Sequence, residues 1–431
     1  MRILLTGANG FIGGQLLAGL MARGHEVVAA VRNPAALRSR FPGVSALAAD
    51  FNRDTAASDW RPRLAGIDAV INCAGVLHGG RGQDIEAIHA KAPMALFDAC
   101  VATGVRRVVQ ISAISADTEA GTIYSLTKKR ADDHLRALPL DWIVLRPSLV
   151  YGEGSYGGTS ALRGLAGLPG ISPLVGDGSA AFRPIHIDDL VETVMRVVES
   201  DRFARQTLEP VGPEVVTLCG LIGKYRAWLG LAPAPILSFP MPVMRVAARL
   251  ADLAGGGPLG TASLRQLEVG NAGNEPATTF ADKIGFAPRR MDDMLARRPA
   301  QTQDLWHARL YFLRPLVRTI LILLWLGSAL AGVLAPVASY AVVDAAFSSL
   351  GLPSRPLALA FSGVDLLIAG ALLARWRPRW MAAIQCIVVA GYTILLTVLA
   401  PGLWLEPFGA LLKNLPILAL IVVWVVLEEE R

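Results

Sequence analysis

The sequence predicts two parts of different kind: an α/β Rossmann domain with a doubly wound parallel sheet and a small substrate lobe, and a C-terminal all-α bundle of four transmembrane helices. Three observations carry this prediction. Short apolar strands alternate with helical segments in the first 150 residues, a glycine-rich loop follows the first strand, and long apolar runs dominate the C-terminal region. The mean hydropathy of +0.45 exceeds that of an ordinary soluble protein, which agrees with a chain partly embedded in a membrane.

The expected strands of the α/β domain are short, continuously apolar and separated by helical or loop segments. Such strands are typical of a parallel sheet that helices cover on both faces, and right-handed crossovers then give the doubly wound order. The strands are expected at Ile3–Thr6, Val27–Val31, Ala69–Asn72, Val108–Ile111 and Trp142–Leu145, with a helix over Gly13–Ala22.

Changes in composition divide the chain of 431 residues, which is long enough for two or three domains. Within the lobe, Val216–Leu229 and Pro240–Leu253 are expected to form amphipathic helices. The expected segments are the NAD(P)-binding Rossmann domain over residues 1–210, the substrate-covering lobe over 211–300, a juxtamembrane linker over 301–316 and the transmembrane domain over 317–431.

The first chemical signal is a glycine loop, Thr6–Gly13, which reads TGANGFIG between the first strand and the first helix. In a dinucleotide site the first glycine permits a tight turn, the second lets backbone N–H groups approach a pyrophosphate, and the third lets the helix pack on the strand. Arg32 follows the second strand, where NAD-binding proteins carry an acidic residue for the ribose 2′-hydroxyl. A guanidinium suits a 2′-phosphate, so NADP(H) is favoured and NAD is the alternative.

Tyr124 and Lys128 form a Tyr-x-x-x-Lys motif on a segment that reads as a helix, so the two side chains share one face. A phenol has an ordinary pKa near about 10, and a nearby ammonium favours the phenolate. We therefore expect Lys128 to lower the pKa of Tyr124 toward the working pH.

These motifs occur in the order of the extended and atypical short-chain dehydrogenase/reductase families, which the first half of the chain resembles. The chain also is similar to epimerase/dehydratase-like proteins and to the accessory NADPH-binding subunit of respiratory complex I. Besides the glycine loop and Tyr124-x-x-x-Lys128, the matching segments are Asp50-Phe51, Asn72–Gly75, Arg146–Ser148, Val150–Gly152 and Phe182–Asp189.

The resemblance implies a role for each matching residue. Tyr124 would exchange a proton with the substrate oxygen, Lys128 would also hold the nicotinamide ribose, and Ser112 would hydrogen-bond the substrate oxygen, with Ser115 as its rival. His186 is expected to be structural, and Arg183 to line the cofactor or substrate cleft. The expected cofactor-binding residues are Gly7, Asn9, Gly10, Phe11, Ile12, Gly13, Arg32, Asp50, Phe51, Cys73, Ala74, Gly75, Lys128 and Pro147.

The C-terminal region contains four apolar segments of about the 20 residues that a bilayer core requires. Arginines flank the first segment and fill the connection between the second and third, so the positive-inside rule places both termini in the cytoplasm. Since no cleavable signal is seen at the N-terminus, the Rossmann domain is expected in the cytoplasm, on a multi-pass inner-membrane protein. The segments are Val317–Val337, Leu357–Ala374, Met381–Ala400 and Phe408–Leu427.

Two ionisable residues, Asp365 and Lys413, fall inside these segments, and we expect them to pair because an isolated charge there is costly. Snorkelling of Lys413 and a protonated Asp365 are the alternatives. The region resembles the DoxX-like membrane family through Asp304–Arg309 and Lys413–Pro416.

Composition and charge exclude some classes of binding partner. The net charge of +6 comes with scattered or juxtamembrane arginines, so no nucleic acid is expected, and the four cysteines lack metal or disulfide spacing. The resulting hypothesis is a membrane-anchored NADP(H)-dependent oxidoreductase acting on a lipophilic carbonyl or alcohol. The alternatives are a non-catalytic NADPH-binding module of a membrane or quinone-related complex, and an epimerase. Membrane lipid, a membrane complex or a second copy of the chain are the other expected partners.

Overall fold

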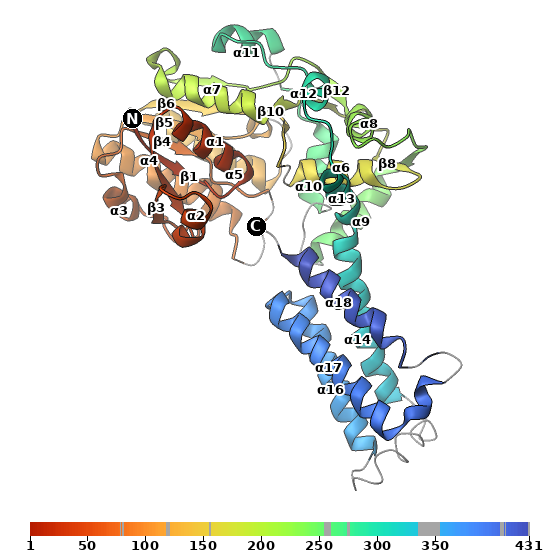
Figure 1. Ribbon diagram of the computed structural model, residues 1–431. Helices are drawn as coiled ribbons and strands as arrows, with labels where there is room; N and C mark the ends of the chain where they lie inside the picture. Colours follow the sequence, from red (N-terminus) through yellow and green to blue (C-terminus); the bar gives the residue numbers. More distant parts are fainter. Residues whose placement is uncertain are drawn as a thin grey trace. The chain divides into compact units, whose positions relative to one another are not determined.

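The computed structural model describes residues 1–77, 79, 82–117, 121–154, 157–253, 260–273, 276–334, 354–405, 409 and 411–429. The chain forms two compact units, Met1–Ala308 and Arg309–Arg431, which are described separately here (Figure 1).

The first unit is built on a sheet of seven strands in the order β11-β6-β5-β4-β1-β2-β3. Every neighbouring pair in this sheet is parallel. The strand order reverses between β1 and β4, which makes their carboxyl ends the topological switch point where such folds bind ligands. The predicted doubly wound parallel sheet is therefore confirmed. The strands are β1 (Arg2–Thr6), β2 (Glu26–Val31), β3 (Ser45–Ala48), β4 (Ala69–Asn72), β5 (Arg107–Ile111), β6 (Asp141–Leu145) and β11 (Gln206–Leu208).

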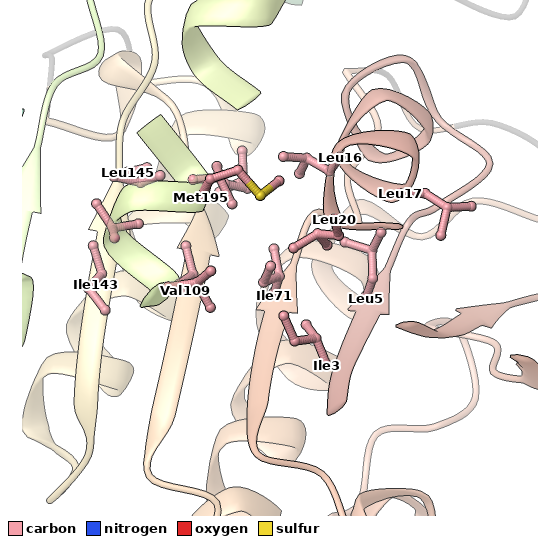
Figure 2. Close-up of a cluster of buried hydrophobic side chains, with 14 of the residues drawn as sticks. Ile3, Leu5, Leu16, Leu17, Leu20, Ile71, Val109, Ile143, Leu145 and Met195 are labelled. Carbon is pink, nitrogen blue, oxygen red and sulfur yellow. The ribbon is translucent and has the colours of Figure 1, made fainter. Parts of the chain in front are cut away.

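Alternate residues of each strand enter two different cores, because successive side chains of a strand point to opposite faces. Ile3 and Leu5 pack under α1 (Phe11–Ala22) and α7 (Ile187–Glu199), and Figure 2 shows Leu20 of α1 beside Leu5 and Leu16 of α1 directed toward Met195 of α7. Leu4 between them packs on the other face, whose cover includes residues of α4 (Ala92–Thr103) and α5 (Ile123–Ala137). Both faces of the sheet are therefore covered and shielded from water, as continuously apolar strands require. The remaining elements of this part are α2 (Pro34–Arg40), α3 (Ala57–Trp60), η1 (Arg61–Leu64), the π-helical turn η2 (Ala87–Lys91), η3 (Ile114–Asp117) and η4 (Asp201–Phe203).

A third core forms the lobe. It contains Leu162 and Leu174 together with Leu221 and Ala308, so residues on both sides of position 210 build it. The predicted helix Val216–Leu229 begins at Leu218 instead, because Val216 pairs with Phe182 and Thr217 caps the helix by accepting from Gly220 N–H. The lobe elements are β7 (Val150–Tyr151), α6 (Gly158–Gly167), β8 (Ser172–Val175), β9 (Ala181–Phe182), β10 (Ile185–His186), β12 (Val216–Thr217), α8 (Leu218–Trp228), β13 (Ile236–Phe239), α9 (Met241–Leu253), α10 (Thr261–Val269), α11 (Ala277–Ile284), α12 (Met291–Arg297) and α13 (Thr302–Leu310).

The second unit is helical. By length and composition, α14 (Leu313–Leu334), α16 (Ser354–Leu373) and α17 (Pro378–Leu399) are long and apolar enough to cross a membrane. The fourth apolar helix, α18 (Asn414–Glu428), has 15 described residues, and Phe408 of the predicted fourth segment lies outside the described residues. The last three residues of the predicted first segment, 335–337, also lie outside them. A short helix, η6 (Pro401–Trp404), follows α17.

The predicted pair of Asp365 and Lys413 does not form. Asp365 is buried and accepts a hydrogen bond of 2.6 Å from the Ser328 hydroxyl, whereas Lys413 is exposed just before α18. The Glu428 side chain, which is 5% exposed, does meet cations, 3.3 Å from Arg314 and 3.4 Å from Arg318. The prediction failed because sequence position gives the depth of a residue but not the face of the helix to which it points.

Candidate nucleotide-binding and active site

The glycine loop has a shape that two of its glycines impose. Gly7 has a φ of +69°, and a Cβ built on it would lie 2.6 Å from the carbonyl oxygen of Cys73. A Cβ on Gly13 would lie 2.1 Å from the carbonyl oxygen of Gly7. Gly10 caps α1 without a side-chain hydrogen bond, so the first turn of the helix keeps free N–H groups that can bind a phosphate.

A chain of buried polar side chains joins the carboxyl ends of three strands. The Thr6 hydroxyl of β1 donates to Asn72 Oδ1 of β4 over 2.6 Å, and Asn72 Nδ2 donates to Gln110 Oε1 of β5 over 2.7 Å. Thr6 Oγ1 also accepts from the N–H groups of Cys73 and Ala74. These bonds fix the turn after β4 against the glycine loop, which is the place where a dinucleotide crosses the sheet.

His89 holds the other side of the turn after β4. It stands on the π-helical turn η2, and its Nε2 accepts from Val76 N–H over 3.0 Å. Its Nδ1 lies 3.3 Å from Thr127 Oγ1, and its ring packs edge-to-face on that of Tyr124 with centroids 5.2 Å apart. Burial, and then the positive charge of Lys128, lower the pKa of His89 to about 2. His89 is therefore neutral with its proton on Nδ1, since Nε2 acts as an acceptor.

Tyr124 and Lys128 lie one turn apart on α5, near the carboxyl ends of β4 and β5. Lys128 is 4% exposed, and its Nζ donates to the Ile111 carbonyl over 3.0 Å. A Cβ built on Gly75 would lie 3.3 Å from Lys128 Nζ, so the ammonium borders the turn after β4. The structure thus brings both members of the motif to the switch point of the sheet.

The predicted lowering of the Tyr124 pKa is wrong for this arrangement. Burial, and then the negative charge of Asp132, raise the pKa of Tyr124 to about 12. Among the described residues no hydrogen bond joins the phenol to Lys128, whose ammonium is engaged with Ile111. Desolvation and the Asp132 charge act in the same direction, so the phenol is a proton donor in this state.

Three donors converge on one oxygen of Asp132, a fully buried residue of α5. Ser112 Oγ donates to Asp132 Oδ2 over 2.8 Å, and Arg146 Nε and Nη2 donate to the same atom over 3.0 and 2.9 Å. Burial raises the pKa of Asp132 to about 7, although the Ser112 hydrogen bond and then the positive charge of Lys128 lower it. Because the Arg146 guanidinium also donates twice, we assign the ionised form. The single hydroxyl proton of Ser112 is committed here, so its predicted contact with substrate requires the hydroxyl to turn.

Matches to protein families agree with this geometry. Residues 7–164 match the family described as NAD(P)H-binding, and residues 322–422 match the DoxX-like family. The chain therefore carries an NAD(P)-binding Rossmann domain of the short-chain dehydrogenase/epimerase type, followed by a DoxX-like domain.

Curated relatives of the dehydrogenase-type domain include sugar-nucleotide enzymes. The chain is 26% identical over 207 residues to UDP-2-acetamido-2,6-beta-L-arabino-hexul-4-ose reductase of Pseudomonas aeruginosa, a match covering 46% of this chain and 50% of the relative. It is 29% identical over 258 residues to dTDP-4-dehydrorhamnose reductase of Mycolicibacterium smegmatis, covering 51% of this chain and 72% of the relative. The match to a Mycobacterium tuberculosis protein, Rv2047c, covers only 26% of that protein. The chain thus spans half or less of several of these relatives.

Solved structures share the fold. DesIV, the dTDP-glucose 4,6-dehydratase of Streptomyces venezuelae solved with NAD and TYD, matches with a TM-score of 0.54 and 20% identity, covering 72% of this chain and 97% of its own. MoeE5, solved with UDP-glucose and NAD, matches with a TM-score of 0.52 and 21% identity, covering 72% of this chain and all of its own.

The other predicted cofactor residues of the Rossmann domain differ in their surroundings. Arg32 follows β2 and is exposed, as are Asn9 and Gly10, whereas Phe11 and Ile12 are half-buried. Asp50 accepts from Asn52, and Phe51 is buried edge-to-face on Trp60 with centroids 5.2 Å apart. Pro147 is buried after β6. Phe51 therefore belongs to the core by its side chain and can meet an adenine only through its backbone.

The structure also places the two residues expected near the substrate cleft. His186 is buried and caps α7 by accepting from Asp188 N–H, which agrees with a structural role. The Arg183 carbonyl accepts from the Ser148 hydroxyl. Sequence reasoning missed His89, Asp132 and Arg146 as a set. The signal for Asp132 was its position four residues after Lys128, which places it on the same helical face.

Proposed function

We propose that this protein is a membrane-anchored, NADP(H)-dependent oxidoreductase that interconverts a carbonyl and an alcohol on a lipophilic substrate. The observation that supports it most is the placement of Tyr124 and Lys128 on one face of α5, beside the turns after β4 and β5. A nicotinamide coenzyme bound at these turns would supply or accept the hydride.

The protein's own residues would handle the proton. In the reducing direction the Tyr124 phenol, protonated because its pKa is raised to about 12, gives its proton to the substrate oxygen as the carbonyl carbon gains hydride. Lys128 would stabilise the phenolate left behind, since an ammonium favours the charged form. His89 keeps the Tyr124 ring in place by its edge-to-face contact.

The test is Tyr124→Phe. It should lower turnover of any accepted carbonyl by about 10²- to 10⁴-fold while the NADPH dissociation constant changes less than about twofold. Lys128→Met should lower both turnover and NADPH affinity. Its matched control is Lys129→Met, since Lys129 is exposed and pairs with Asp133. Full turnover by Tyr124→Phe would refute the catalytic role.

One set of observations favours a second candidate, a non-catalytic NADPH-binding module. The Ser112 proton is committed to Asp132, so this hydroxyl is not free in this state, and one of the three Lys128 N–H donors is used by Ile111. If Tyr124→Phe leaves every measured activity unchanged but NADPH still binds, this module is the better description. An epimerase would instead keep its coenzyme tightly bound through turnover and show no net consumption of NADPH.

The choice of NADP(H) over NAD rests on Arg32. Its exposed guanidinium follows β2, and no hydrogen bond or ion pair to another described residue engages it. Arg32→Asp should raise the NADPH dissociation constant by about 10- to 100-fold and the NADH constant far less. Arg40→Asp, at another exposed arginine, is the control. Equal weakening of both coenzymes would contradict the assignment.

The apolar surface of the second unit supports the proposed membrane anchor. Its long helices expose large apolar side chains, among them Leu367, Ile387 and Val398, each more than 70% exposed. The positive-inside rule applied to Arg375, Arg377 and Arg379 gives an inner-membrane protein with its Rossmann domain in the cytoplasm. In the lobe, α9 also exposes Val243, Val246 and Leu250, which favours a lipophilic substrate.

Cysteine labelling tests the orientation. With the four native cysteines replaced, Leu403→Cys should react with a membrane-impermeant maleimide in intact spheroplasts, and Arg377→Cys only after permeabilisation. The opposite pattern would invert the proposed topology, and labelling of both sites in intact spheroplasts would refute the anchor.

A further inference from the structure

A pocket of the first unit lies apart from the residues proposed for catalysis. Its volume is about 380 Å³, and its lining includes Gln15 of α1, His186 and Asp188 at the start of α7, and Arg298 after α12. Neither Tyr124, Lys128 nor any glycine of the Thr6–Gly13 loop lines it. The proposed oxidoreductase chemistry therefore leaves this pocket without a role.

Close packing separates the pocket from the glycine loop. Gly152 and Ile187 both line the pocket, and a Cβ built on Gly152 would lie 2.4 Å from Ile187 Cγ2. The same Cβ would lie 3.6 Å from Phe11 Cζ, an atom of the loop. The pocket thus borders the expected cofactor site through this packing without containing its glycines.

A buried guanidinium forms one wall of the pocket. Arg163 of α6 is 3% exposed and lies with its Cζ 4.7 Å from the centroid of the Trp228 ring. Its Nη2 donates to the Gly152 carbonyl over 2.6 Å, but its carboxylate neighbour, Asp304, is 3.8 Å from Nη1. Its Nε is buried and has no partner among the described residues. Arg163 is therefore a buried cation whose donors are only partly used.

A second guanidinium, that of Arg298, belongs to a side chain that is 35% exposed and also has one buried donor without a partner among the described residues. Arg298 Nε lies 3.2 Å from Glu153 Oε1, whereas its Nη1 is buried and has no partner in the described part of the chain. Arg289, also in the lining, is already paired with Asp189 at 2.7 Å. A buried N–H without an acceptor is unfavourable, more so when the group is charged. The two unpartnered atoms themselves have almost no accessible surface, so an anion in the pocket would act through the positive charge of both guanidinium groups and their other N–H donors.

The remaining wall is apolar. Trp228, Met294 and Leu295 line it, and the Trp228 ring is held in place because its Nε1 donates to the Arg298 carbonyl over 2.7 Å. We propose that this pocket binds a small organic anion, with a carboxylate or phosphate on Arg163 and Arg298 and an apolar body against Trp228. It binds together with the coenzyme rather than in its place.

The experiment uses the full chain in mild detergent, saturated with NADPH, and calorimetric titration with phenyl phosphate, benzoate and the neutral benzyl alcohol. At least one of the two anions should bind at one site, at least tenfold more tightly than benzyl alcohol. The better anion distinguishes a phosphate ligand from a carboxylate. Arg298→Gln and Arg163→Lys should each weaken that binding at least tenfold and leave the NADPH dissociation constant within twofold.

The matched control is Arg290→Gln, because Arg290 is an exposed neighbour that pairs with Glu214 and does not line the pocket. It should bind the anion like the unmodified protein. The proposal is overturned if neither anion binds, if benzyl alcohol binds as tightly, if Arg298→Gln has no effect, or if NADPH displaces the anion. Displacement of the anion by NADPH would show that the anion binds in the coenzyme site. The Tyr124→Phe test of the proposed function would be unaffected by that result.

Discussion

Two buried aspartates, one in each unit, show how differently the two halves of the chain treat a carboxylate. Asp132 has no exposed surface and receives three hydrogen bonds on one oxygen, two of them from the Arg146 guanidinium. Asp365 is 3% exposed and, among the described residues, receives a hydrogen bond from the Ser328 hydroxyl and interacts with the Tyr392 hydroxyl. Among the described residues no cation lies within ion-pair distance of Asp365, although Asp132 meets Arg146 at 2.9 Å.

The difference indicates which charge state the carboxyl group of each aspartate requires. Asp132 balances a charge that Arg146 carries in any case, so removal of the carboxylate takes away the negative charge that contacts this buried cation directly. Among the described residues Asp365 has only neutral partners, so its charge would be uncompensated in an apolar helical unit, where it is costly. The same substitution, Asp to Asn, should therefore have unequal effects at the two positions.

The largest effect is expected for Asp132→Asn. It breaks the fully buried pair with Arg146 and leaves Glu209 as a negative charge that still acts on the guanidinium, which should destabilise the first unit by about 3 kcal/mol, the low end for a broken buried ion pair. Denaturant unfolding in detergent, with hydrogen exchange in α5 to assign the transition, measures it. Asp133→Asn, at a neighbouring exposed residue that pairs with Lys129 and Arg136, should cost less than about 1 kcal/mol. Similar losses for both variants would contradict a buried ion pair at Asp132.

The next effect is a dependence of stability on pH, which arises from His89 in the first unit. The pKa of His89 is lowered to about 2 in the fold, while an unfolded histidine titrates near about 6.5. Between these values the unfolded chain binds a proton that the folded chain does not, so stability falls as the pH falls below about 6.5. The slope from this group reaches about 1.4 kcal/mol per pH unit.

His89→Gln should remove that part of the slope. Glutamine keeps an acceptor for Val76 N–H but does not titrate, so the variant should lose about 2 kcal/mol less than the unmodified protein between pH 6.5 and 5 by the same relation. Unfolding midpoints measured across this range are the readout. Parallel stability curves for the two proteins would show that His89 is protonated in the fold.

A smaller effect is expected for Asp365→Asn in the helical unit. The amide can still accept from Ser328, and no cation loses its partner, so the unit should change by less than about 1 kcal/mol. Ser328→Ala should cost about 0.6–2 kcal/mol by the measured range for such bonds. Thermal unfolding of the second unit in detergent gives both values. A loss of several kcal/mol for Asp365→Asn would show that this carboxylate is charged and paired.

The smallest effect is expected for Lys413→Leu. Because Lys413 is exposed and lies outside any ion pair with Asp365, the change should stay within about 0.5 kcal/mol. The double variant Asp365→Asn with Lys413→Leu should equal the sum of the single changes. A coupling energy above about 1 kcal/mol would restore the pair that the sequence predicts.

Hydrophobic periodicity and glycine spacing were sufficient to predict the strands, the glycine turn and the helical motif of the first unit. The runs Ile3–Thr6 and Ala69–Asn72 could be placed within one residue, because a strand buried on both faces is apolar at every position. Gly7 could be expected at a tight turn, and its positive φ confirms it. The Tyr124-x-x-x-Lys128 spacing likewise placed both side chains on one helical face.

Contacts between distant segments could not be derived in this way. The pairing of Asp132 with Arg146 depends on how α5 packs beside β6, and the neutral state of His89 depends on burial that no local pattern reports. For the same reason the sequence indicated that Lys128 would acidify Tyr124, whereas desolvation reverses the direction. In the second unit, hydropathy located the apolar helices but not the rotation of each helix, so the partner of Asp365 was misassigned.

The Thr6 hydroxyl has a consequence for how the protein comes into being. It bonds to Asn72, 66 residues further along the chain, and to the two amides that follow. A nascent polypeptide leaving the ribosome consequently cannot complete its phosphate-binding turn when the glycines emerge. The turn is completed only when the fourth strand has been synthesised and added to the growing sheet, so coenzyme capture during translation begins after that strand has emerged.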